Sequence, residues 1–74
     1  MANIRKVKYE ASGASDLFLS YRAEDQREVY ELAKKMAATD KFGFAFMRKL
    51  VWTDNGIDVS TVIVNADGSF ENID

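Results

Sequence analysis

The chain has 74 residues, 47% of them hydrophobic and 30% charged, and a formal net charge of -2 at pH 7. A chain of this length builds one hydrophobic core, so we expect a single small domain over residues 1–74. The absence of cysteine and histidine excludes disulfides, thiolate nucleophiles, imidazole bases and Cys/His zinc sites. It also favours a reducing compartment, which we take to be the cytoplasm.

The sequence predicts no contact with a membrane. The longest apolar run, residues 42–52, is interrupted by Arg48 and Lys49 and is shorter than the roughly 20 residues of a membrane span. The N-terminus carries Arg5, Lys6 and Lys8 but lacks the apolar core of a signal peptide.

The first 21 residues predict a β-hairpin. Over residues 4–11, Arg5, Val7 and Tyr9 alternate with Ile4, Lys6 and Lys8, a pattern typical of an edge strand whose lysines discourage association with other sheets. Residues 11–16 are small, polar and glycine-containing, which predicts a loop. A second strand is expected over residues 17–21.

Apolar side chains then recur at helical spacing, at Val29, Leu32, Ala33, Met36 and Ala37. This spacing predicts a helix over residues 23–38 with one apolar stripe. Glu24 and Asp25 in its first turn and lysines near its end complement the helix dipole, and Glu31 and Lys35 are spaced for an ion pair.

Residues 42–52 predict a long strand, because Phe42, Phe44 and Phe46 alternate with small residues. A helix over residues 44–51 is the competing interpretation, since the residue types there also tolerate helices. Gly43 and the turn that follows the segment favour the strand.

Turn residues predict two further hairpins and so complete the fold. Asn55-Gly56 is typical of a type I′ turn, in which both residues take positive φ. With that turn, the strand pairs are Trp52 with Val59, Leu50 with Thr61 and Arg48 with Ile63 on one face, and Val51 with Ser60 and Lys49 with Val62 on the other. Residues 65–68 predict a type I turn with a glycine bulge, and a last strand covers residues 69–73. The predicted fold is an α+β domain, one helix packed on an antiparallel sheet in the order ββαβββ.

This arrangement places apolar side chains on both faces of the sheet. One face carries Leu50, Trp52, Ile57, Val59 and Ile63, and the other carries Val51, Val62, Val64 and Phe70. One helix covers one face, and the sequence leaves open which. The second face is either sealed by the first hairpin or exposed as a partner surface, with self-association as one outcome. A scatter of β-branched residues chosen for strand propensity is the alternative.

Carboxylates are the remaining acid–base groups, and Asp54, Asp58, Asp67 and Glu71 gather in the C-terminal third. Local hydrogen bonding in turns accounts for Asp54 and Asp67. The spacing after Asn65 does not fit a calcium loop, and the isolated glycines form no phosphate loop. We therefore predict no enzymatic activity, no cofactor and no metal.

Basic residues also lie beside aromatic ones, a combination that binds phosphates and stacks bases. The residues concerned are Arg5, Lys6 and Lys8 next to Tyr9, and Arg48 and Lys49 between Phe46 and Trp52. Residues 51–74 contain five acids and no basic residue, which repels a polyanion. Nucleic-acid binding is therefore the alternative hypothesis.

The leading hypothesis is a non-enzymatic protein-binding module, an inhibitor or adaptor that docks a sheet face or edge on a larger protein. Trp52 is the candidate anchor, and the acidic C-terminal hairpin is expected to steer the chain toward a basic surface. The full set of candidate contacts is Trp52, Asp58, Val62, Val64, Asp67, Phe70 and Glu71. In size and composition alone, the chain resembles inhibitors and accessory proteins that bacteriophages and mobile elements encode.

Overall fold

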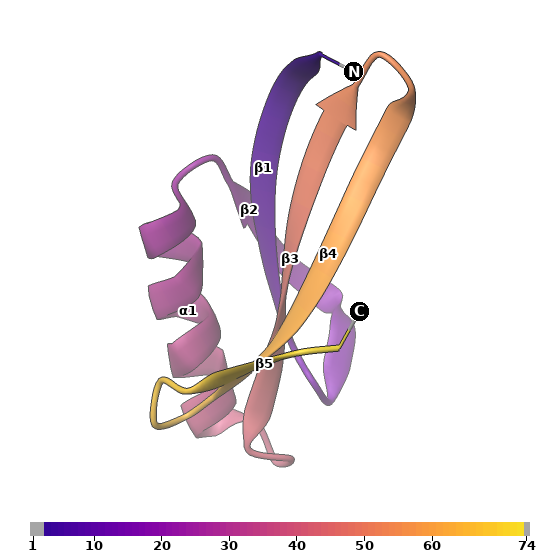
Figure 1. The fold of residues 1–74 in the computed structure, drawn as a ribbon. Coiled ribbons are helices and arrows are strands. Elements are labelled where there is room, and N and C mark those ends of the chain that lie inside the picture. The colour runs from indigo at the N-terminus through magenta and orange to yellow at the C-terminus, as the bar shows by residue number, and fades with distance from the viewer. Residues whose placement is uncertain (1–2, 74) are drawn as a thin grey trace.

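The computed structural model describes residues 3–73, except for the side chains of residues 17–19. Its elements are β1 (Ile4–Gly13), β2 (Asp16–Ala23), α1 (Gln26–Thr39), β3 (Phe44–Thr53), β4 (Gly56–Asn65) and β5 (Phe70–Asn72) (Figure 1). The strands form one antiparallel sheet in the order β2-β1-β3-β4-β5. The predicted α+β class and the ββαβββ order are confirmed, and residues 44–53 are a strand rather than a helix.

α1 begins after Asp25, whose carboxylate accepts hydrogen bonds from the backbone nitrogens of Arg27 at 3.0 Å and Glu28 at 3.4 Å. This cap satisfies amide groups that have no partner within the helix. The predicted start at residue 23 is wrong, because β2 continues to Ala23 and Asp25 then ends the extended chain. The ion pair of Glu31 also differs from the prediction, since its carboxylate lies 3.7 Å from Nζ of Lys34.

The core lies between α1 and the sheet and is built largely from small side chains. The buried apolar residues are Ala11, Val29, Ala33, Ala37, Ala45, Met47 and Val64. Alanines on both the helix and the strands let α1 approach the sheet closely. α1 therefore covers the face that carries Val64, and the face that carries Trp52 points away from it.

The predicted β3–β4 register is wrong by two residues. Trp52 pairs with Ile57 and Leu50 with Val59. Asp54 and Asn55 form the turn with negative φ, and Gly56 alone takes a positive φ, of 130°. The type I′ turn that requires positive φ at Asn55 is therefore absent. A shift of two residues leaves each side chain on its predicted face, because side chains alternate with a period of two.

The first hairpin also differs from its prediction in one respect. β1 is an interior strand that pairs with both β2 and β3, so it is not an edge strand along its whole length. Its pairing with β2 begins at Tyr9, which leaves Ile4 and residues 6–8 paired with β3 alone. The turn is shorter than the predicted loop and consists of residues 14 and 15.

The last turn agrees with the prediction, and the last strand is shorter than predicted by one residue at each end. Gly68 has a φ of 93°, and its backbone nitrogen donates to the carbonyl of Asn65 at 2.9 Å. β5 then pairs with residues 62–64 of β4.

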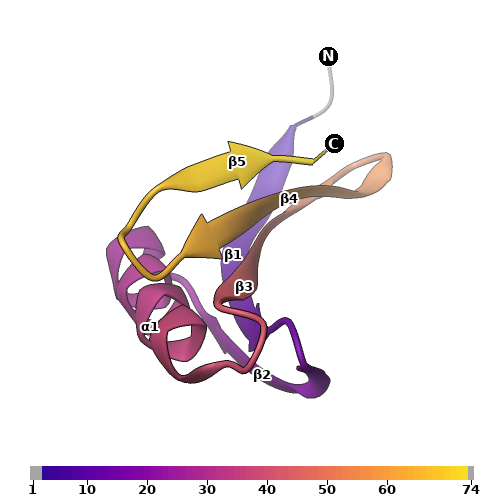
Figure 2. The same ribbon diagram turned by 90° about the horizontal axis from the view of Figure 1, so that it is seen from below.

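The sheet curves around α1, which lies on its concave side (Figure 2). The β3–β4 hairpin and the first half of β1 extend beyond the helix (Figure 1), and the molecule measures 40 × 21 × 21 Å. Within residues 3–73, no helix has both the length and the apolar character that a bilayer crossing requires.

Candidate functional site

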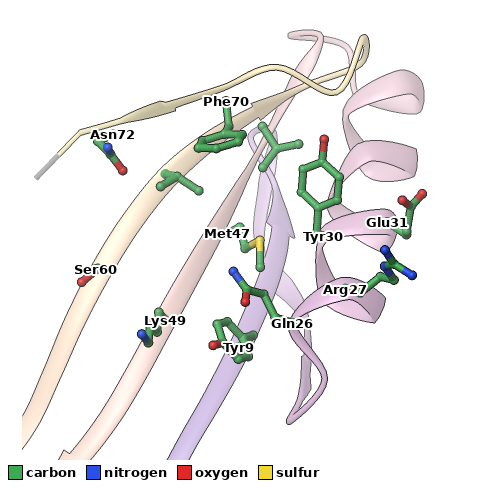
Figure 3. A pocket seen from close by; sticks show the side chains of 12 residues that line it. Tyr9, Gln26, Arg27, Tyr30, Glu31, Met47, Lys49, Ser60, Phe70 and Asn72 are labelled. Carbon is green, nitrogen blue, oxygen red and sulfur yellow. The ribbon is translucent and has the colours of Figure 1, made fainter.

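Two surfaces of the described chain are candidates for binding, one on each side of the sheet. On the helix side, α1 and the outer strands β4 and β5 enclose a groove of about 610 Å³ (Figure 3). The groove is lined by Tyr9, Gln26, Arg27, Tyr30, Glu31, Met47, Lys49, Ser60, Val62, Val64, Phe70 and Asn72.

The other candidate is the sheet face that points away from α1, which we call the open face. Side chains alternate along a strand, so the burial of Ala45 and Met47 against α1 turns their neighbours outward. The open face carries Lys6, Lys8, Glu10 and Ser12 from β1, Phe44, Phe46, Arg48, Leu50 and Trp52 from β3, and Ile57, Val59, Thr61 and Ile63 from β4. The first hairpin does not seal this face, because β1 and β2 belong to the same sheet.

Four apolar side chains at the far end of the open face form what we call the tip patch, namely Leu50, Trp52, Ile57 and Val59. Ile57 is 52% exposed and Val59 is 50% exposed, whereas Leu50 and Trp52 are half-buried. Nζ of Lys6 lies 5.3 Å from the centre of the Trp52 ring, within the range of a cation–π contact. The tip patch is therefore an apolar surface with a cation at its border.

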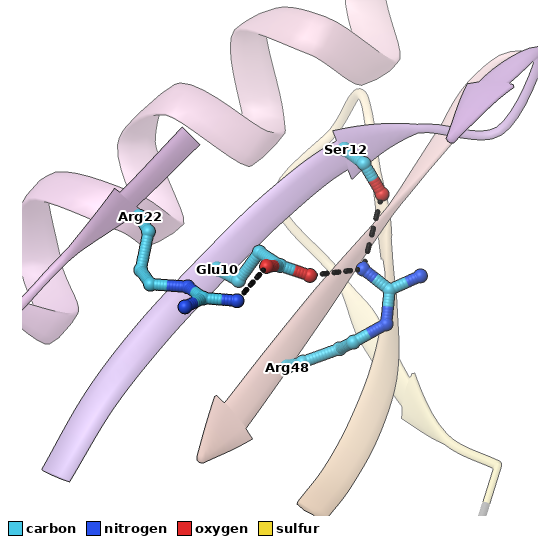
Figure 4. Close-up of polar contacts among 4 residues, drawn as sticks. All are labelled: Glu10, Ser12, Arg22 and Arg48. Atoms are coloured by element: carbon cyan, nitrogen blue, oxygen red, sulfur yellow. Dashed lines mark hydrogen bonds and ion pairs between the residues drawn. The ribbon is translucent and has the colours of Figure 1, made fainter. Parts of the chain in front are cut away.

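A row of charged side chains crosses the middle of the open face (Figure 4). The carboxylate of Glu10 accepts from Nη2 of Arg22 at 2.9 Å and from Nη1 of Arg48 at 3.0 Å. Nη1 of Arg48 also donates to Oγ of Ser12, which is fully buried, at 3.2 Å. This row separates the tip patch from Phe44 and Phe46, whose rings meet edge to face at 5.6 Å between centroids.

The basic residues predicted to contact nucleic acid do not form one free surface. Arg5 is paired with Asp54, and Arg48 is paired with Glu10. Lys49 pairs across the sheet with Ser60 and lines the groove on the helix side. Lys6 and Lys8 remain on the open face, where neither forms an ion pair with another described residue.

The residues predicted to contact a protein partner are also divided between the two sides of the sheet. Trp52 and Glu71 belong to the open face, while Asp58, Val62, Val64 and Phe70 belong to the helix side. Val64 is fully buried and so lies in the core, whereas Phe70 is 61% exposed. Asp67 lies in the turn before β5.

Two carboxylates are held by local hydrogen bonds in turns. Asp67 accepts from Oγ and the backbone nitrogen of Ser69 at 2.6 and 2.9 Å, and the hydroxyl contact in particular lowers the pKa of Asp67. Asp40 accepts from Ser15 in the same way, and this lowers the pKa of Asp40. Hydrogen bonds that favour the charged form explain both shifts.

Sequence reasoning missed Glu10 and Arg22, which organise the centre of the open face. Glu10 is the one acid in a strand with three basic residues, Arg5, Lys6 and Lys8. An acid among basic residues was the signal that could have singled out Glu10. The partners of Glu10 come from β2 and β3, however, and depend on the register of both pairings.

Comparison of the chain with protein-family models, with curated proteins and with solved structures gives no match.

Proposed function

We propose that this chain is a non-enzymatic protein-binding module, an inhibitor or adaptor that docks on a larger protein in the cytoplasm through its tip patch. The observation that carries the proposal is the half-exposed pair Ile57 and Val59 beside Trp52, on a sheet face over which no described helix lies. Contiguous exposed apolar side chains on a small domain are typical of a partner surface.

The border of the tip patch indicates the chemistry of the partner. Lys6 and Lys8 lie along one side, and neither has a carboxylate partner among residues 3–73. A complementary surface is apolar at its centre and presents carboxylates opposite the two lysines. Trp52 suits the role of anchor, because tryptophan dominates the binding energy of many interfaces.

The size of the face is adequate for a specific interface. The broad side of the molecule has edges of 40 and 21 Å. A standard interface buries about 800 Å² on each partner. Docking therefore needs most of the open face, with the tip patch as the apolar part at its far end.

We expect the acids of the C-terminal hairpin to contribute less to the electrostatic steering of association with the partner than the sequence suggests. Asp58 and Glu71 lie on opposite sides of the sheet, and Ser69 binds Asp67 in its turn. We therefore expect neutralisation of Lys6 and Lys8 to slow association more than neutralisation of these three acids.

Nucleic-acid binding is the second candidate, and one contact favours it. The Lys6 ammonium over the Trp52 ring, with Lys8 two residues further along the strand, is a basic and aromatic pair that could hold one nucleotide. The ion pairs of Arg5 and Arg48 weigh against it, because those two charges already have carboxylate partners. A gel-shift titration at low salt with single-stranded and duplex DNA and RNA tests this alternative.

Affinity capture from cell lysate, with and without nuclease, tests the main proposal. The unchanged chain is compared with a variant of the tip patch and with a matched control variant. The double variant Ile57→Lys, Val59→Lys places charges in the tip patch, and both positions are already exposed. Phe42→Lys is the control, since Phe42 is also exposed but lies in the turn before β3.

The proposal expects a stoichiometric protein partner that resists nuclease, is lost with the double variant and is retained with the control. Capture that both variants retain equally would overturn the tip patch as the docking surface. Capture that disappears with nuclease would favour the nucleic-acid alternative, and concentration-dependent sizing of the pure chain would identify a second copy as the partner.

A further inference from the structure

The groove on the helix side has the dimensions and the lining of a small-molecule site. Its volume of about 610 Å³ lies within the roughly 300–1,000 Å³ typical of such sites. It exists because one helix does not cover five strands. α1 packs mainly on β1 and β3 and less on β4 and β2, and it makes no contact with β5 (Figures 2 and 3).

One end of the groove is apolar. Met47, Val62 and Val64 line it from the sheet. Tyr30 and Phe70 stand on its two sides (Figure 3). The hydroxyl of Tyr30 donates to the carbonyl of Gly68, which ties α1 to the turn before β5 and fixes the spacing of these walls. Phe70 is 61% exposed, so an apolar ligand in the groove removes its ring from water.

The other end of the groove carries positive charge. Lys49 comes from β3, and Gln26 and Arg27 come from the first turn of α1. Within residues 3–73, neither Lys49 nor Arg27 forms an ion pair. The groove contains one carboxylate, that of Glu31, and it lies 3.7 Å from Nζ of Lys34. A chain with a net charge of -2 thus has a locally basic groove.

From this combination we propose that the groove binds a small amphiphilic anion, with an aliphatic or aromatic body and a carboxylate or sulfonate head. The body packs on Met47, Val62 and Phe70, and the head lies beside Lys49, on the opposite side of the groove from Arg27 (Figure 3). The ligand buries the exposed face of Phe70, and its charge complements Lys49, which forms no ion pair within residues 3–73. This site is on the opposite side of the sheet from the tip patch, so it is independent of the proposed protein interface.

Titration of the whole protein with decanoate, below the concentration at which it forms micelles, tests the proposal. Methyl signals of methionine and valine report the result, because Met47, Val62 and Val64 line the groove and Val59 lies on the open face. We expect saturable shifts at the three groove residues and none at Val59. Decyltrimethylammonium is the control ligand, since it has the same chain and the opposite charge, and we expect it to bind about tenfold more weakly.

Three variants separate the contributions of the two ends. Lys49→Glu should weaken decanoate about tenfold, whereas Lys41→Glu, a charge reversal outside the groove, should leave its affinity unchanged. Phe70→Ser should weaken both ligands while decanoate remains the tighter. Equal affinity for the two ligands, shifts that map to Val59, or groove shifts that depend on protein concentration alone would each overturn the proposal. The last result would identify a second copy as the occupant.

Discussion

At the scale of single residues, Asp40 joins the first hairpin to the end of α1. Its carboxylate accepts from Oγ of Ser15 at 2.6 Å, from the backbone nitrogen of Ser15 at 3.0 Å and from that of Phe42 at 2.9 Å. Gly13 leaves room for this carboxylate, since a Cβ atom there would lie 2.7 Å from Oδ2 of Asp40. One side chain therefore links two turns that are distant in the sequence.

The hydrogen bonds from Ser15 predict how acid affects stability. They lower the pKa of Asp40 below its ordinary value of 3.8, so the folded state holds the proton less tightly than the unfolded state does. The stabilisation is therefore complete above pH 3.8 and is lost as the pH falls through the lower pKa of the folded state. Urea unfolding at pH 7 and at pH 3 should show a smaller loss of stability on acidification for Asp40→Asn than for the unchanged chain. An identical loss in both would mean that Asp40 does not contribute to the pH dependence.

Two glycines with positive φ differ in the space around them, so their substitution distinguishes the cost of backbone strain from the cost of crowding. Gly43 has a φ of 81° with nothing within 4 Å of a Cβ atom, whereas Gly68 has a φ of 93° and a Cβ atom there would lie 3.1 Å from Oη of Tyr30. Substitution of either glycine by alanine should lower the free energy of unfolding by about 1 kcal/mol, because alanine disfavours the left-handed backbone conformation. Gly68→Ala should cost about 1 kcal/mol more, because it also disturbs the Tyr30 contact. Thermal or urea unfolding measures both, and equal costs would show that the contact with Tyr30 adds nothing.

At the scale of elements, β1 is the strand around which the sheet is organised. It pairs with β2 on one side and β3 on the other, and Glu10 at its centre binds an arginine from each neighbour. The side chain of Glu10 is 14% exposed, that of Arg48 is 23% exposed and that of Arg22 is 48% exposed. The two ion pairs therefore differ in how far water screens them.

This difference predicts an order of stability among three variants. Arg22→Met should cost less than about 1 kcal/mol, because its ion pair is exposed. Arg48→Met should cost about 1–3 kcal/mol, since it also removes the hydrogen bond to the buried Ser12. Glu10→Gln should cost a similar amount, because it leaves Arg48 without its carboxylate partner. Urea unfolding of the three variants tests the order, and equal costs for the two arginine variants would contradict it.

The elements themselves were largely predictable from the sequence, because each rests on local patterns. The apolar spacing of Val29, Ala33 and Ala37 predicts the helix, and the glycine at position 68 predicts the last turn. The β3–β4 register was not predictable from Asn55-Gly56 alone. The predicted turn centres on Asn55 and Gly56 with positive φ at both, whereas the observed turn is formed by Asp54 and Asn55, and Gly56 pairs with Thr53 as the first residue of β4.

At the scale of the whole molecule, the structure is a two-layer domain with one covered and one open sheet face. Hydrophobicity could not decide which face the helix covers, because β3 and β4 are apolar on both sides. The size of the side chains was the usable signal. Ala11 and Ala45 lie where α1 packs closely, whereas bulky Phe46 and Trp52 lie on the other side.

The candidate site was predictable only in part, because the apolar pattern does not distinguish the two faces of the sheet. The sequence identified Trp52 and the surplus of apolar residues, but it combined residues from both faces into one surface. The pairing of Glu10 with Arg48 and the groove beside α1 both arise from long-range contacts that no local pattern contains.

The central claim is that a protein partner docks on the tip patch, and the fluorescence of Trp52 tests it most directly. Trp52 is the single tryptophan of the chain, so quenching of its emission by acrylamide reports access to the tip patch without any substitution. We would measure quenching of the free chain and of its complex with the captured partner, after correction for the partner's own emission. The account predicts that complex formation protects Trp52 from acrylamide. A stable complex in which Trp52 is quenched as readily as in the free chain would contradict the account.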